Sequence, residues 1–546
     1  MFYTKYFSLC RFFCHNIIKF SIKVVILYLN KYKAIYKIVI NYMKINYIKE
    51  IDDSKVYDVA EKTPISLLNK ISTKYSNTIF LKREDLQPIF SFKCRGAYNK
   101  ISNLNADQIS KGIIAASAGN HAQGVALSAS KLNINALIVM PTTTPSIKIE
   151  SVKKFGVKVL LYGDSFDEAY EHALEISKKD ERIFIHPFDD PLVIAGQGTV
   201  AKEIVEQTKV TPDIFFIPVG GGGLISGMSL YLKKHYPDSK IYGVESEDAP
   251  TLYTALKNGM PTKLDQVGLF VDGCAVKRIG EETFKISKQY VEDVILVSID
   301  ETCAAIKDIY EDTRVMSEPA GALSVAGMKK FIKNNDIKDK NIFAVNSGAN
   351  LNFDRLRHVT ERAEIGEGKE VLLSVKIPEK CGSFRSFCEV IGRRSVSEFN
   401  YRYANDSSAN VFVGIKTDNI QKDKENIFND LDINNYNYID LTKDEVAKLH
   451  LRYMVGGKPN SAINEKLIRF EFPEKPGALL NFLNKMQKDW DITLFHYRNH
   501  GSAFGRVLVG IDIGNYSAKD LDRFLIELGY KYTDETLNQG YSSFLK

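Results

Sequence analysis

The stretch DIFFIPVGGGGLISG, residues 213–227, indicates both the fold of this chain and a kind of ligand. Its first half is a short apolar run, which is typical of a buried parallel strand. Four glycines, Gly220, Gly221, Gly222 and Gly223, follow, and an apolar helix-like run begins at Leu224. Because glycine has no Cβ, this backbone can fold tightly and direct several N–H groups at one anion, beside the positive end of the helix. The pattern predicts a phosphate-binding loop.

The spacing of these glycines disfavours two nucleotide-binding loops. The stretch is neither GxGxxG nor GxxxxGK[ST], so neither a dinucleotide nor a P-loop nucleotide is the expected ligand. The plainer alternative is a tight turn between a strand and a helix, but four glycines exceed what such a turn needs. We therefore expect the loop to hold a different phosphate-bearing molecule.

The same alternation of short apolar runs and amphipathic stretches extends from about residue 77 to residue 350. It predicts an α/β fold with parallel sheets covered by helices on both faces. Ligands of such folds bind beyond the C-terminal ends of the strands, where this chain has turns rich in Gly, Ser and Asn. We expect strands within residues 77–83, 112–117, 136–141, 157–163, 182–188, 213–220, 240–246, 293–298 and 341–348, and helices within residues 120–132 and 165–180.

Composition narrows the kinds of partner. The chain has 546 residues, of which 44% are hydrophobic, and a formal net charge of +6. Residues 1–42 hold seven Lys or Arg and no acidic residue, so they account for the whole surplus. The nearly neutral remainder argues against nucleic acid as the main partner. The length allows about two to four domains.

The first 42 residues are rich in Phe, Tyr, Ile and Lys, unlike the rest of the chain. A membrane-spanning helix needs roughly 20 apolar residues, whereas Lys19, Lys23, Lys31 and Lys33 interrupt every apolar run here. We therefore expect no membrane span, and we find no convincing secretory signal. A basic, acid-free segment would also fit organelle targeting. We favour a start at Met43, which directly precedes sequence typical of a folded domain.

The cysteines indicate neither a metal centre nor a disulfide framework. All seven are scattered, without a CxxC pair or a Cys/His cluster at zinc spacing. So few cysteines in a chain of this length fit a reducing compartment. We expect no metal and a cytoplasmic location, unless residues 1–42 direct the chain to an organelle.

An internal repeat begins after about residue 365. VLLSVKIPEKCGSFRSFCEVI matches KLIRFEFPEKPGALLNFLNKM, with Pro378 opposite Pro473, and EFNYRY matches LFHYRN, with Tyr401 opposite Tyr497. Each unit has the pattern of a strand, a PEKxG turn, a helix, a strand, a turn and a strand. We therefore expect two adjacent α+β units of the βαββ type.

A lone lysine occupies an apolar turn in IFSFKCRGAYN, residues 89–99. Lys93 lies between Phe92 and Cys94, just after a predicted strand. Taken alone, it is best explained as a lysine whose stem packs on apolar neighbours while its ammonium reaches water. The alternative is a desolvated amine of lowered pKa that can form a Schiff base. A phosphate-binding loop together with a Schiff-base lysine implies pyridoxal phosphate.

Two further strand ends carry polar side chains that suit a ligand. In ASAGNHAQGVA, residues 116–126, Ser117 or Asn120 is most simply the N-cap of a helix, and Asn120 is alternatively a donor to a ligand oxygen. In NSGAN, residues 346–350, Ser347 is either an ordinary turn residue or the hydrogen-bond partner of a pyridine nitrogen.

Together these stretches resemble the threonine dehydratases of the fold-type-II pyridoxal-phosphate enzymes, which have a tryptophan synthase β-like catalytic fold. The tail is similar to twin ACT-like regulatory domains of the biosynthetic members. The resemblance covers the chain from about residue 45 to its end. It rests on KREDLQPIFSFKCRGAYN, SAGNHAQGVA, GGGGL, EPAGA and NSGANLNFDRLR, and in the tail on SVSEFNYRYA, LHLRYMVGG, FEFPEKPGALLNFL and LFHYRNHG.

The expected domain layout follows from the repeat and the resemblance. Residues 43–365 form the catalytic domain, and residues 1–42 are an extension that is not necessarily in the mature protein. The two regulatory domains span residues 369–443 and 464–546. The charged stretch ERAEIGEGKE, residues 361–370, is the expected linker before them.

The resemblance implies a role for each candidate residue. Lys93 is the Schiff-base lysine, Asn120 binds the ring hydroxyl of the cofactor and Ser347 its pyridine nitrogen. The phosphate is held by the glycine run and Leu224, that is by Gly220, Gly221, Gly222, Gly223 and Leu224. The substrate lies against the loop of Ser117, Ala118, Gly119 and Asn120. Cys94 stands where the family usually has leucine, and we expect little functional effect of this change.

The activity implied by the resemblance is β-elimination of L-threonine to 2-oxobutanoate and ammonia, the first step of isoleucine biosynthesis. It further implies allosteric inhibition by isoleucine, which valine opposes, and a homotetramer. Tyr401 and Tyr497 are the expected effector contacts, and both would equally fit the aromatic core of their domains.

Two residues favour elimination over other chemistry of the same cofactor. Ser347, unlike an aspartate, does not favour a protonated pyridine, so prompt loss of the β-hydroxyl is favoured over racemisation or transamination. Ala118 stands where related serine racemases look to have a serine base. The alternatives are a serine or catabolic threonine dehydratase, which the paired regulatory units disfavour, and a non-catalytic amino-acid sensor, which the retention of Lys93 and the glycine run disfavours.

Overall fold

The computed structural model describes residues 45–546, apart from gaps at residues 379–382, 393, 395, 406–407, 418–419, 454–463, 474–480, 483–484, 488–489, 499–503 and 545–546. Contacts divide the chain into residues 1–50 and residues 51–546, and nearly all described elements belong to the second unit. Helix α2 (Tyr47–Asp52) is the first described element. The predictions made for residues 1–42 lie outside the described residues.

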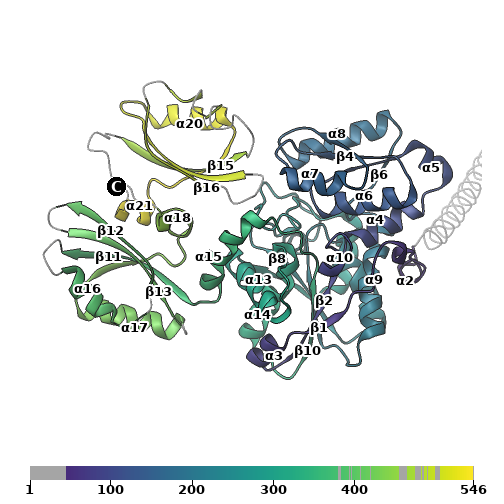
Figure 1. Ribbon diagram of the computed structural model, residues 1–546, viewed down its shortest axis with the longest axis horizontal. Coiled ribbons are helices and arrows are strands. Elements are labelled where there is room, and N and C mark those ends of the chain that lie inside the picture. Colours follow the sequence, from purple (N-terminus) through teal and green to yellow (C-terminus); the bar gives the residue numbers. More distant parts are fainter. Residues whose placement is uncertain are drawn as a thin grey trace, which may run out of the picture. The chain divides into compact units, whose positions relative to one another are not determined.

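The largest sheet has six strands in the order β1-β2-β10-β7-β8-β9. All neighbouring strands in it are parallel, except that β1 runs antiparallel to β2. Figure 1 shows α13 and α14 on one side of this sheet and α9 and α10 on the other. The strands are β1 (Ile65–Leu67), β2 (Thr78–Arg83), β7 (Ile214–Pro218), β8 (Lys240–Ser246), β9 (Asp293–Val297) and β10 (Asn341–Asn346), and these four helices are α9 (Pro191–Gln207), α10 (Gly223–His235), α13 (Ile299–Thr313) and α14 (Pro319–Asn335).

A smaller sheet has four parallel strands in the order β5-β4-β3-β6. Alternate side chains of β3 face different helices, because successive side chains of a strand point to opposite faces. Ile113 and Ala115 pack with α4 and α6, whereas Ile114 and Ala116 pack with α8. The elements are β3 (Ile113–Ala116), β4 (Ala136–Met140), β5 (Lys158–Leu161), β6 (Ile183–Phe184), α4 (Lys93–Ser102), α6 (Asn120–Leu132), α7 (Ser146–Lys153) and α8 (Phe166–Lys179).

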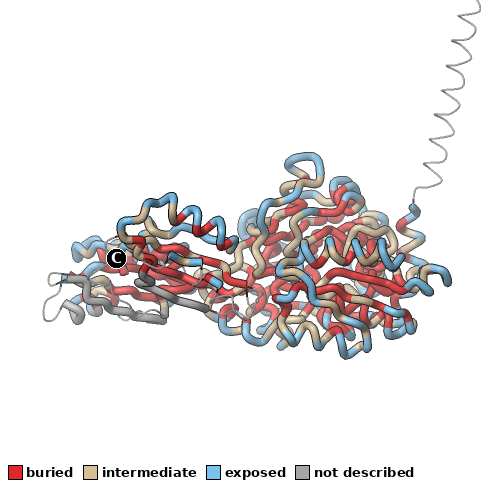
Figure 2. Tube along the Cα trace, turned by 90° about the horizontal axis from the view of Figure 1, so that it is seen from above, coloured by how far each residue is buried: buried red, intermediate tan, exposed pale blue. Residues whose placement is uncertain are grey.

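Burial on both faces explains why these strands are apolar throughout. Every residue of β3 and of β7 is buried, and Figure 2 shows buried strands enclosed by helices with exposed outer sides. The remaining helices of this part are α3 (Asn69–Tyr75), α5 (Ala106–Lys111), α11 (Thr251–Asn258), α12 (Glu281–Tyr290) and α15 (Leu356–Gly366), with 3-10 turns η1 (Val56–Asp58), η2 (Glu84–Leu86) and η3 (Phe353–Arg355).

The C-terminal part contains two four-stranded antiparallel sheets with the same strand order, β12-β13-β11-β14 and β16-β17-β15-β18. This confirms the internal repeat. The first copy has β11 (Glu370–Pro378), α16 (Ser383–Ile391), β12 (Val396–Asn405), β13 (Ser408–Lys416), α17 (Ile420–Ile433) and β14 (Asn437–Asp440). The second has β15 (Glu465–Pro473), β16 (Asp491–Arg498), β17 (Phe504–Asp512), α20 (Ala518–Leu528) and β18 (Lys531–Asp534).

A short helix follows the last strand of each copy, α18 (Glu445–Leu449) and α21 (Gln539–Phe544), with η4 (Leu451–Tyr453) after α18. Asp444 caps the first helix by accepting from Ala447 N, and Asn538 occupies the same place before the second by accepting from Tyr541 N. The two caps also contact each other, because Asn538 Nδ2 donates to Asp444 Oδ2 at 3.1 Å. Both sheets bury one face in a shared cluster with these helices that includes Leu372 and Leu467.

Most predicted elements lie where the sequence placed them. All nine predicted strands form, and β8 and α6 match their predicted ranges residue for residue. Two predictions need correction. The expected linker, residues 361–370, is mostly helical, because α15 continues through Gly366 and β11 begins at Glu370. The βαββ pattern was incomplete, because a further helix and a fourth strand follow in each copy, α17 and β14 in the first and α20 and β18 in the second.

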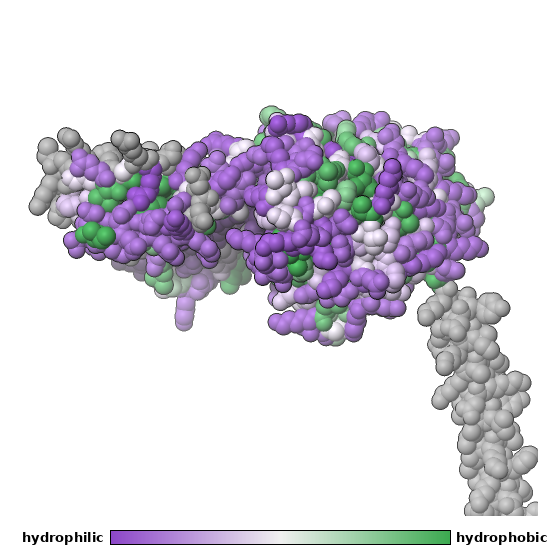
Figure 3. Space-filling view, turned by 90° about the horizontal axis from the view of Figure 1, so that it is seen from below, coloured by the Kyte–Doolittle hydropathy of each residue, from purple (hydrophilic) through white to green (hydrophobic). Residues whose placement is uncertain are grey.

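The surface in Figure 3 is mostly hydrophilic, with small scattered hydrophobic groups. Within the described part of the chain, no helix is both long and apolar enough to cross a membrane.

Candidate functional site

A pairing between two distant segments places Lys93 beside Ser347. Ser91 forms an isolated antiparallel bridge with Gly348. On either side of this bridge, Phe92 N donates to Ser347 O at 3.2 Å and Ala349 N donates to Phe90 O at 2.9 Å. Helix α4 then begins at Lys93 itself. The apolar turn predicted from the sequence therefore pairs with the segment after β10 and leads directly into α4.

A buried ion-pair cluster fixes the first turn of α4. Arg95 is fully buried and donates to Glu84 at 2.7 Å and to Glu203 of α9 at 2.6 Å. Glu203 also accepts from Lys82 of β2 at 2.6 Å. Buried charges require partners of this kind, and removal of one would leave another uncompensated. The cluster therefore holds the start of α4, and with it Lys93, against β2 and α9.

The Lys93 amine lies in a desolvated environment. Its Nζ donates to Pro187 O at 3.2 Å and lies 5.3 Å from the centroid of the Phe92 ring. Burial lowers the pKa of Lys93 to about 8, against the opposing influence of Cys274 and Glu318. An amine with such a pKa is partly neutral near pH 7 and is a competent nucleophile and base. The structure thus supports the second of the two interpretations of this lysine.

The glycine run forms a cradle of free backbone amides. Gly222 has φ of +90°, and α10 begins at Gly223. None of the amide N–H groups of Gly220, Gly221, Gly222 and Gly223 donates a hydrogen bond to another described residue. The carbonyl oxygens are engaged elsewhere, because Thr251 Oγ1 donates to Gly220 O at 2.9 Å and Thr283 Oγ1 donates to Gly221 O at 2.8 Å. This arrangement fits a phosphate group.

Neighbouring residues leave no room for side chains in this cradle. A Cβ on Gly221 would lie 2.2 Å from the ring of Phe188, and one on Gly220 would lie 2.9 Å from the Cα of Cys274. The need for glycine here is steric as well as conformational. Phe188 and Cys274 could not be assigned to the site from the sequence, because both lie far from the glycines along the chain.

Asn120 is the first residue of α6 and its amide is held at both ends. Its Nδ2 donates to Glu318 Oε1 at 2.7 Å, and its Oδ1 accepts from Asn350 Nδ2 at 2.7 Å. One hydrogen of Nδ2 remains for a ligand oxygen. Neither Asn120 nor Ser117 is the N-cap, because Gly119 occupies that position.

The proposed substrate loop is open on the side of Gly119. A Cβ on Gly119 would have no described atom within 4 Å. Ser117 Oγ accepts from Gly119 N at 3.2 Å, so its hydroxyl shapes the loop. Ala118 is half-buried.

Ser347 lies at the end of β10 with 3% of its surface exposed. Its carbonyl oxygen accepts from Phe92, while its hydroxyl has no hydrogen bond to another residue in the described part of the chain. A hydroxyl that no neighbouring residue engages can donate to a ligand. A heterocyclic nitrogen would be a suitable acceptor.

Glu318 is a site residue to which the sequence analysis gave no role. It immediately precedes α14, is 4% exposed, and accepts from Asn120. Burial, and then the nearby Asp272 carboxylate, raises the pKa of Glu318 to about 7. A Cβ on Gly348 would lie 2.4 Å from its Oε1, so the carboxylate lies over the turn that carries Ser347. The one available signal was its place in EPAGA, before a proline at the start of a helix.

Taken together, the groups fit pyridoxal phosphate. The site offers an amine of lowered pKa, a cradle of free amides, an amide donor and an unpaired hydroxyl at four strand or helix ends. Among the described residues, no group of three or more His, Cys, Asp or Glu side chains is arranged to hold a metal ion.

The predicted effector contacts are only partly described. Tyr401 lies in β12 and Tyr497 in β16, which occupy the same place in the two copies of the repeat. Their side chains lie outside the described part of the structure, so their role stays a prediction.

Comparisons with known proteins agree with this geometry. Residues 56–348 match the family described as pyridoxal-phosphate dependent enzyme. Residues 361–451 and 457–545 each match the C-terminal regulatory domain of threonine dehydratase. The chain is 52% identical to the biosynthetic L-threonine dehydratase IlvA of Pasteurella multocida, over 91% of this chain and 97% of that protein. It is 48% identical to the enzyme of the same name from Escherichia coli, over 91% and 97%.

Solved structures of related proteins share the catalytic fold. The processed form of threonine deaminase isoform 2 from Solanum lycopersicum superposes with a TM-score of 0.57 and 48% sequence identity, covering 58% of this chain and 92% of that one. The sequence similarity to the Pasteurella multocida protein, over 91% of this chain, extends to both the catalytic and the regulatory parts. The chain therefore belongs to the pyridoxal-phosphate-dependent enzymes, and it carries the duplicated C-terminal regulatory domain of threonine dehydratase.

Proposed function

We propose that this protein converts L-threonine to 2-oxobutanoate and ammonia by β-elimination, and that isoleucine lowers this activity. The proposal is carried by one observation above the rest: a desolvated amine, Lys93, and a cradle of free amides occur together in a chain whose curated relatives are named threonine dehydratases. This reaction would be the first step of isoleucine biosynthesis.

Four parts of the chain would hold the cofactor. Lys93 would hold its aldehyde group, the amides from Gly220 to Leu224 its phosphate, Asn120 its ring hydroxyl and Ser347 its ring nitrogen. Bound there, pyridoxal phosphate withdraws electrons from the α-carbon of an amino acid and so makes the α-proton acidic. The loop of Ser117, Ala118 and Gly119 would receive the substrate carboxylate.

Lys93 would serve as the general base. Once the amine of threonine has displaced it, Lys93 Nζ is free to accept the α-proton, and its pKa of about 8 matches this task near neutral pH. Burial makes the neutral form accessible, while the Cys274 and Glu318 groups oppose a larger shift. Pro187 O, 3.2 Å from Nζ, would orient the amine after release.

Ser347 and Ala118 support elimination over racemisation. A serine hydroxyl does not supply a proton to a ring nitrogen as a carboxylic acid would, so electrons are better released through loss of the β-hydroxyl. Ala118 carries no group that could deliver a proton to the opposite face of the substrate. Measurable racemisation of threonine or serine by the purified enzyme would contradict this part of the proposal.

A steady-state assay tests the activity. Formation of the 2-oxo acid is measured with threonine and with serine, each with and without isoleucine. We expect threonine to be preferred and isoleucine to inhibit. Preference for serine without inhibition would favour a serine or catabolic enzyme instead. No turnover, in a protein that still binds isoleucine, would favour a non-catalytic sensor.

For the regulatory half, we propose isoleucine as inhibitor and valine as its opponent, with Tyr401 and Tyr497 as effector contacts. Their equivalent places in β12 and β16 support the pairing. Unchanged isoleucine inhibition in both Tyr401→Ala and Tyr497→Ala would remove this assignment. We also propose a homotetramer in the cytoplasm. Light scattering of the purified protein would test the tetramer, and fractionation of the source cells would test the location.

A further inference from the structure

A cavity of about 400 Å³ lies between the catalytic part and the second regulatory sheet. Its volume is within the range of small-molecule sites. It is separate from the cofactor site, since none of Lys93, Asn120, Ser347 or the glycine run lines it. One wall comes from residues of β15, β17 and β18. The others come from η3, α13, α15 and α18 and from the loops after β8 and α11.

The regulatory wall carries more positive than negative charge. Glu471 of β15 accepts from both Arg506 of β17 and Lys531 of β18, the latter at 3.2 Å. We call these three residues the Glu471 triad. A single carboxylate thus serves two cations, and one positive charge is left over. Nearby Arg469 has its own partner, Glu535, at 2.9 Å.

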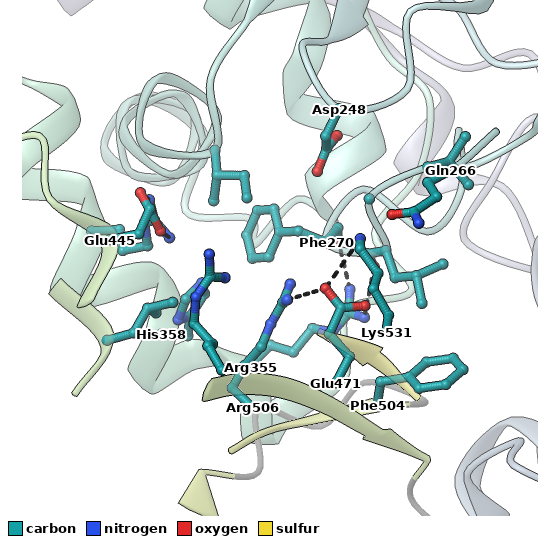
Figure 4. A pocket seen from close by; sticks show the side chains of 17 residues that line it. Asp248, Gln266, Phe270, Arg355, His358, Glu445, Glu471, Phe504, Arg506 and Lys531 are labelled. Atoms are coloured by element: carbon teal, nitrogen blue, oxygen red, sulfur yellow. Dashed lines mark hydrogen bonds and ion pairs between the residues drawn. The ribbon is translucent and has the colours of Figure 1, made fainter. Parts of the chain in front are cut away.

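The opposite wall carries a carboxylate with one buried oxygen that has no hydrogen-bond partner in the described part of the chain. This oxygen is Asp248 Oδ1. Figure 4 shows the Asp248 carboxylate directed into the cavity from the side opposite Arg506 and Glu471. An unpaired carboxylate oxygen that is shielded from water is costly, and a ligand cation would relieve this cost.

An apolar surface lies between the two charged walls. Phe270, which is 8% exposed, borders the cavity together with Ile299, Leu269 and Leu449. Arg355 lies beside Phe270 and donates to its carbonyl oxygen at 2.9 Å. The cavity therefore offers an excess cation, an unpaired anion and an apolar surface, which together complement a zwitterion with an aliphatic side chain.

The first regulatory sheet shows that the fold does not require these charges. In the second sheet, Glu471 pairs across from Arg506 on one side and from Lys531 on the other. In the first, Lys376 takes the place of Glu471 and pairs across from Asn410 and Asn437. The same strands thus form without the triad. The charges are peculiar to the copy whose sheet faces the cavity.

We propose that this cavity binds an aliphatic α-amino acid, with its carboxylate at Arg506 and Lys531, its ammonium group at Asp248 and its side chain on Phe270. The inference rests on the proposed function, because it adds a second effector site to the regulation proposed there. It differs from the sites assigned to Tyr401 and Tyr497.

A route from the cavity to the catalytic part is visible in its lining. Arg362 of α15 borders the cavity and pairs with Asp300 of α13 and with Glu445 of α18 at 2.8 Å. Residues of α13 and of β10, the strand that ends just before Ser347, belong to the same core cluster. A ligand that moves Arg362 would therefore act on elements that pack against the strand leading to the site.

The test is calorimetric titration of the full-length holoenzyme with three probes. L-Isoleucine carries both charges, 3-methylpentanoate lacks the ammonium group, and 2-methylbutylamine lacks the carboxylate. Because the tyrosine sites would also bind isoleucine, the titrations are repeated in a Tyr401→Ala/Tyr497→Ala background. We expect isoleucine to retain a binding event there, and each single-charge probe to bind roughly tenfold or more weaker, as the loss of one charged pair predicts.

Two variants separate the charged walls. Asp248→Asn keeps the shape of the side chain. It should lower the affinity for isoleucine at least about tenfold and leave the affinity for 3-methylpentanoate unchanged. Arg506→Gln should lower the affinity for 3-methylpentanoate and leave the affinity for 2-methylbutylamine unchanged. The matched controls are Asp265→Asn in the same catalytic region and Arg523→Gln in the same regulatory domain, both of them exposed residues that do not line the cavity.

The proposal is overturned if isoleucine binds Asp248→Asn as tightly as wild type, or if no binding remains in the double-tyrosine background. Because Arg506→Gln removes a partner of the partly buried Glu471 and could destabilise the fold, thermal unfolding is measured for each variant. Asp248→Asn alone decides if Arg506→Gln does not fold. Threonine turnover of the wild type is measured in parallel. Its absence would defeat the proposed function, while the binding experiment would still decide on the cavity.

Discussion

The cofactor site offers its ligand's phosphate a set of free backbone amides, whereas the charged cavity offers a ligand the side chains of Asp248, Arg506 and Lys531. The amides of the glycine run are fixed by carbonyl contacts with Thr251 and Thr283. The cations of the cavity already share Glu471 and can exchange one partner for another.

This difference teaches how each region suits its ligand. Fixed amides suit a phosphate that stays bound, because no side chain must be reordered when it enters. Paired side chains suit a ligand that comes and goes, because the empty cavity keeps most of its charges compensated. Substitutions of the residues that hold the cofactor should therefore change function more than substitutions around the cavity, which should only adjust its regulation.

The largest effect is expected for Lys93→Ala. The variant loses both the residue that holds the cofactor and the general base, so turnover of threonine should fall by about 10³-fold or more. Absorbance of the bound cofactor and formation of 2-oxobutanoate are the measurements. Lys100→Ala, on the same helix but paired with Asp190 at 2.7 Å, is the control and should stay near wild type. Comparable losses of turnover in both variants would show that damage to helix α4, and not the loss of the Lys93 amine, causes the effect.

Glu318→Gln should change the dependence of stability on pH. The pKa of Glu318 is raised from the ordinary 4.5 to about 7, so the folded state holds its proton more tightly. The resulting stabilisation is complete below about pH 4.5 and is lost as the pH rises through about 7. The neutral glutamine should therefore be more stable than wild type by up to about 3 kcal/mol above pH 7.

Urea unfolding of the apoprotein at pH 5 and pH 8 measures this difference. The gain in Glu318→Gln should be present at pH 8 and mostly absent at pH 5. Ser347 and Asn120 should keep their places, since glutamine can still accept from Asn120. A gain of equal size at both pH values would show that the carboxylate does not titrate as stated.

Gly221→Ala should weaken cofactor binding roughly tenfold or more, corresponding to about 1.4 kcal/mol. The new methyl group would lie 2.2 Å from the Phe188 ring, so the ring or the cradle must move. Equilibrium dialysis of pyridoxal phosphate gives the affinity. The double variant Gly221→Ala/Phe188→Ala removes the clash and should recover part of the loss. No recovery would show that the cradle needs glycine for another reason.

The smallest effect is expected for Glu445→Gln, at the edge of the cavity. Arg362 loses one of its two carboxylate partners but keeps Asp300. The coupling between the cavity and the catalytic part should therefore change while the fold is kept. We expect the isoleucine concentration for half inhibition to rise about threefold, within the roughly 0.5–2 kcal/mol by which such residues modulate coupling. Glu425→Gln, exposed on α17, is the control. A loss of turnover as large as that of Lys93→Ala would contradict the expectation that substitutions around the cavity affect regulation and not catalysis.

Local patterns were sufficient for the strands and for the glycine cradle. β8 and α6 follow from apolar runs and small polar turns that lie next to each other in the chain. The repeat could also be predicted from the sequence, because its two copies share identical residues at a nearly constant spacing. The second helix and fourth strand of each copy were missed, since α17 and α20 have few letters in common and their place depends on the sheet that they cover.

By itself, the sequence determined the parallel α/β fold and the duplicated regulatory part, and it singled out Lys93, Asn120, Ser347 and the glycine run as candidate site residues, because these features lie in short contiguous motifs. Only the tertiary structure decided that Glu318, Phe188 and Cys274 adjoin these groups, and that Asp248 faces the Glu471 triad across a cavity. The physical reason is that burial, pKa and charge pairing arise from residues that are distant in the chain and meet only when the sheets and helices pack.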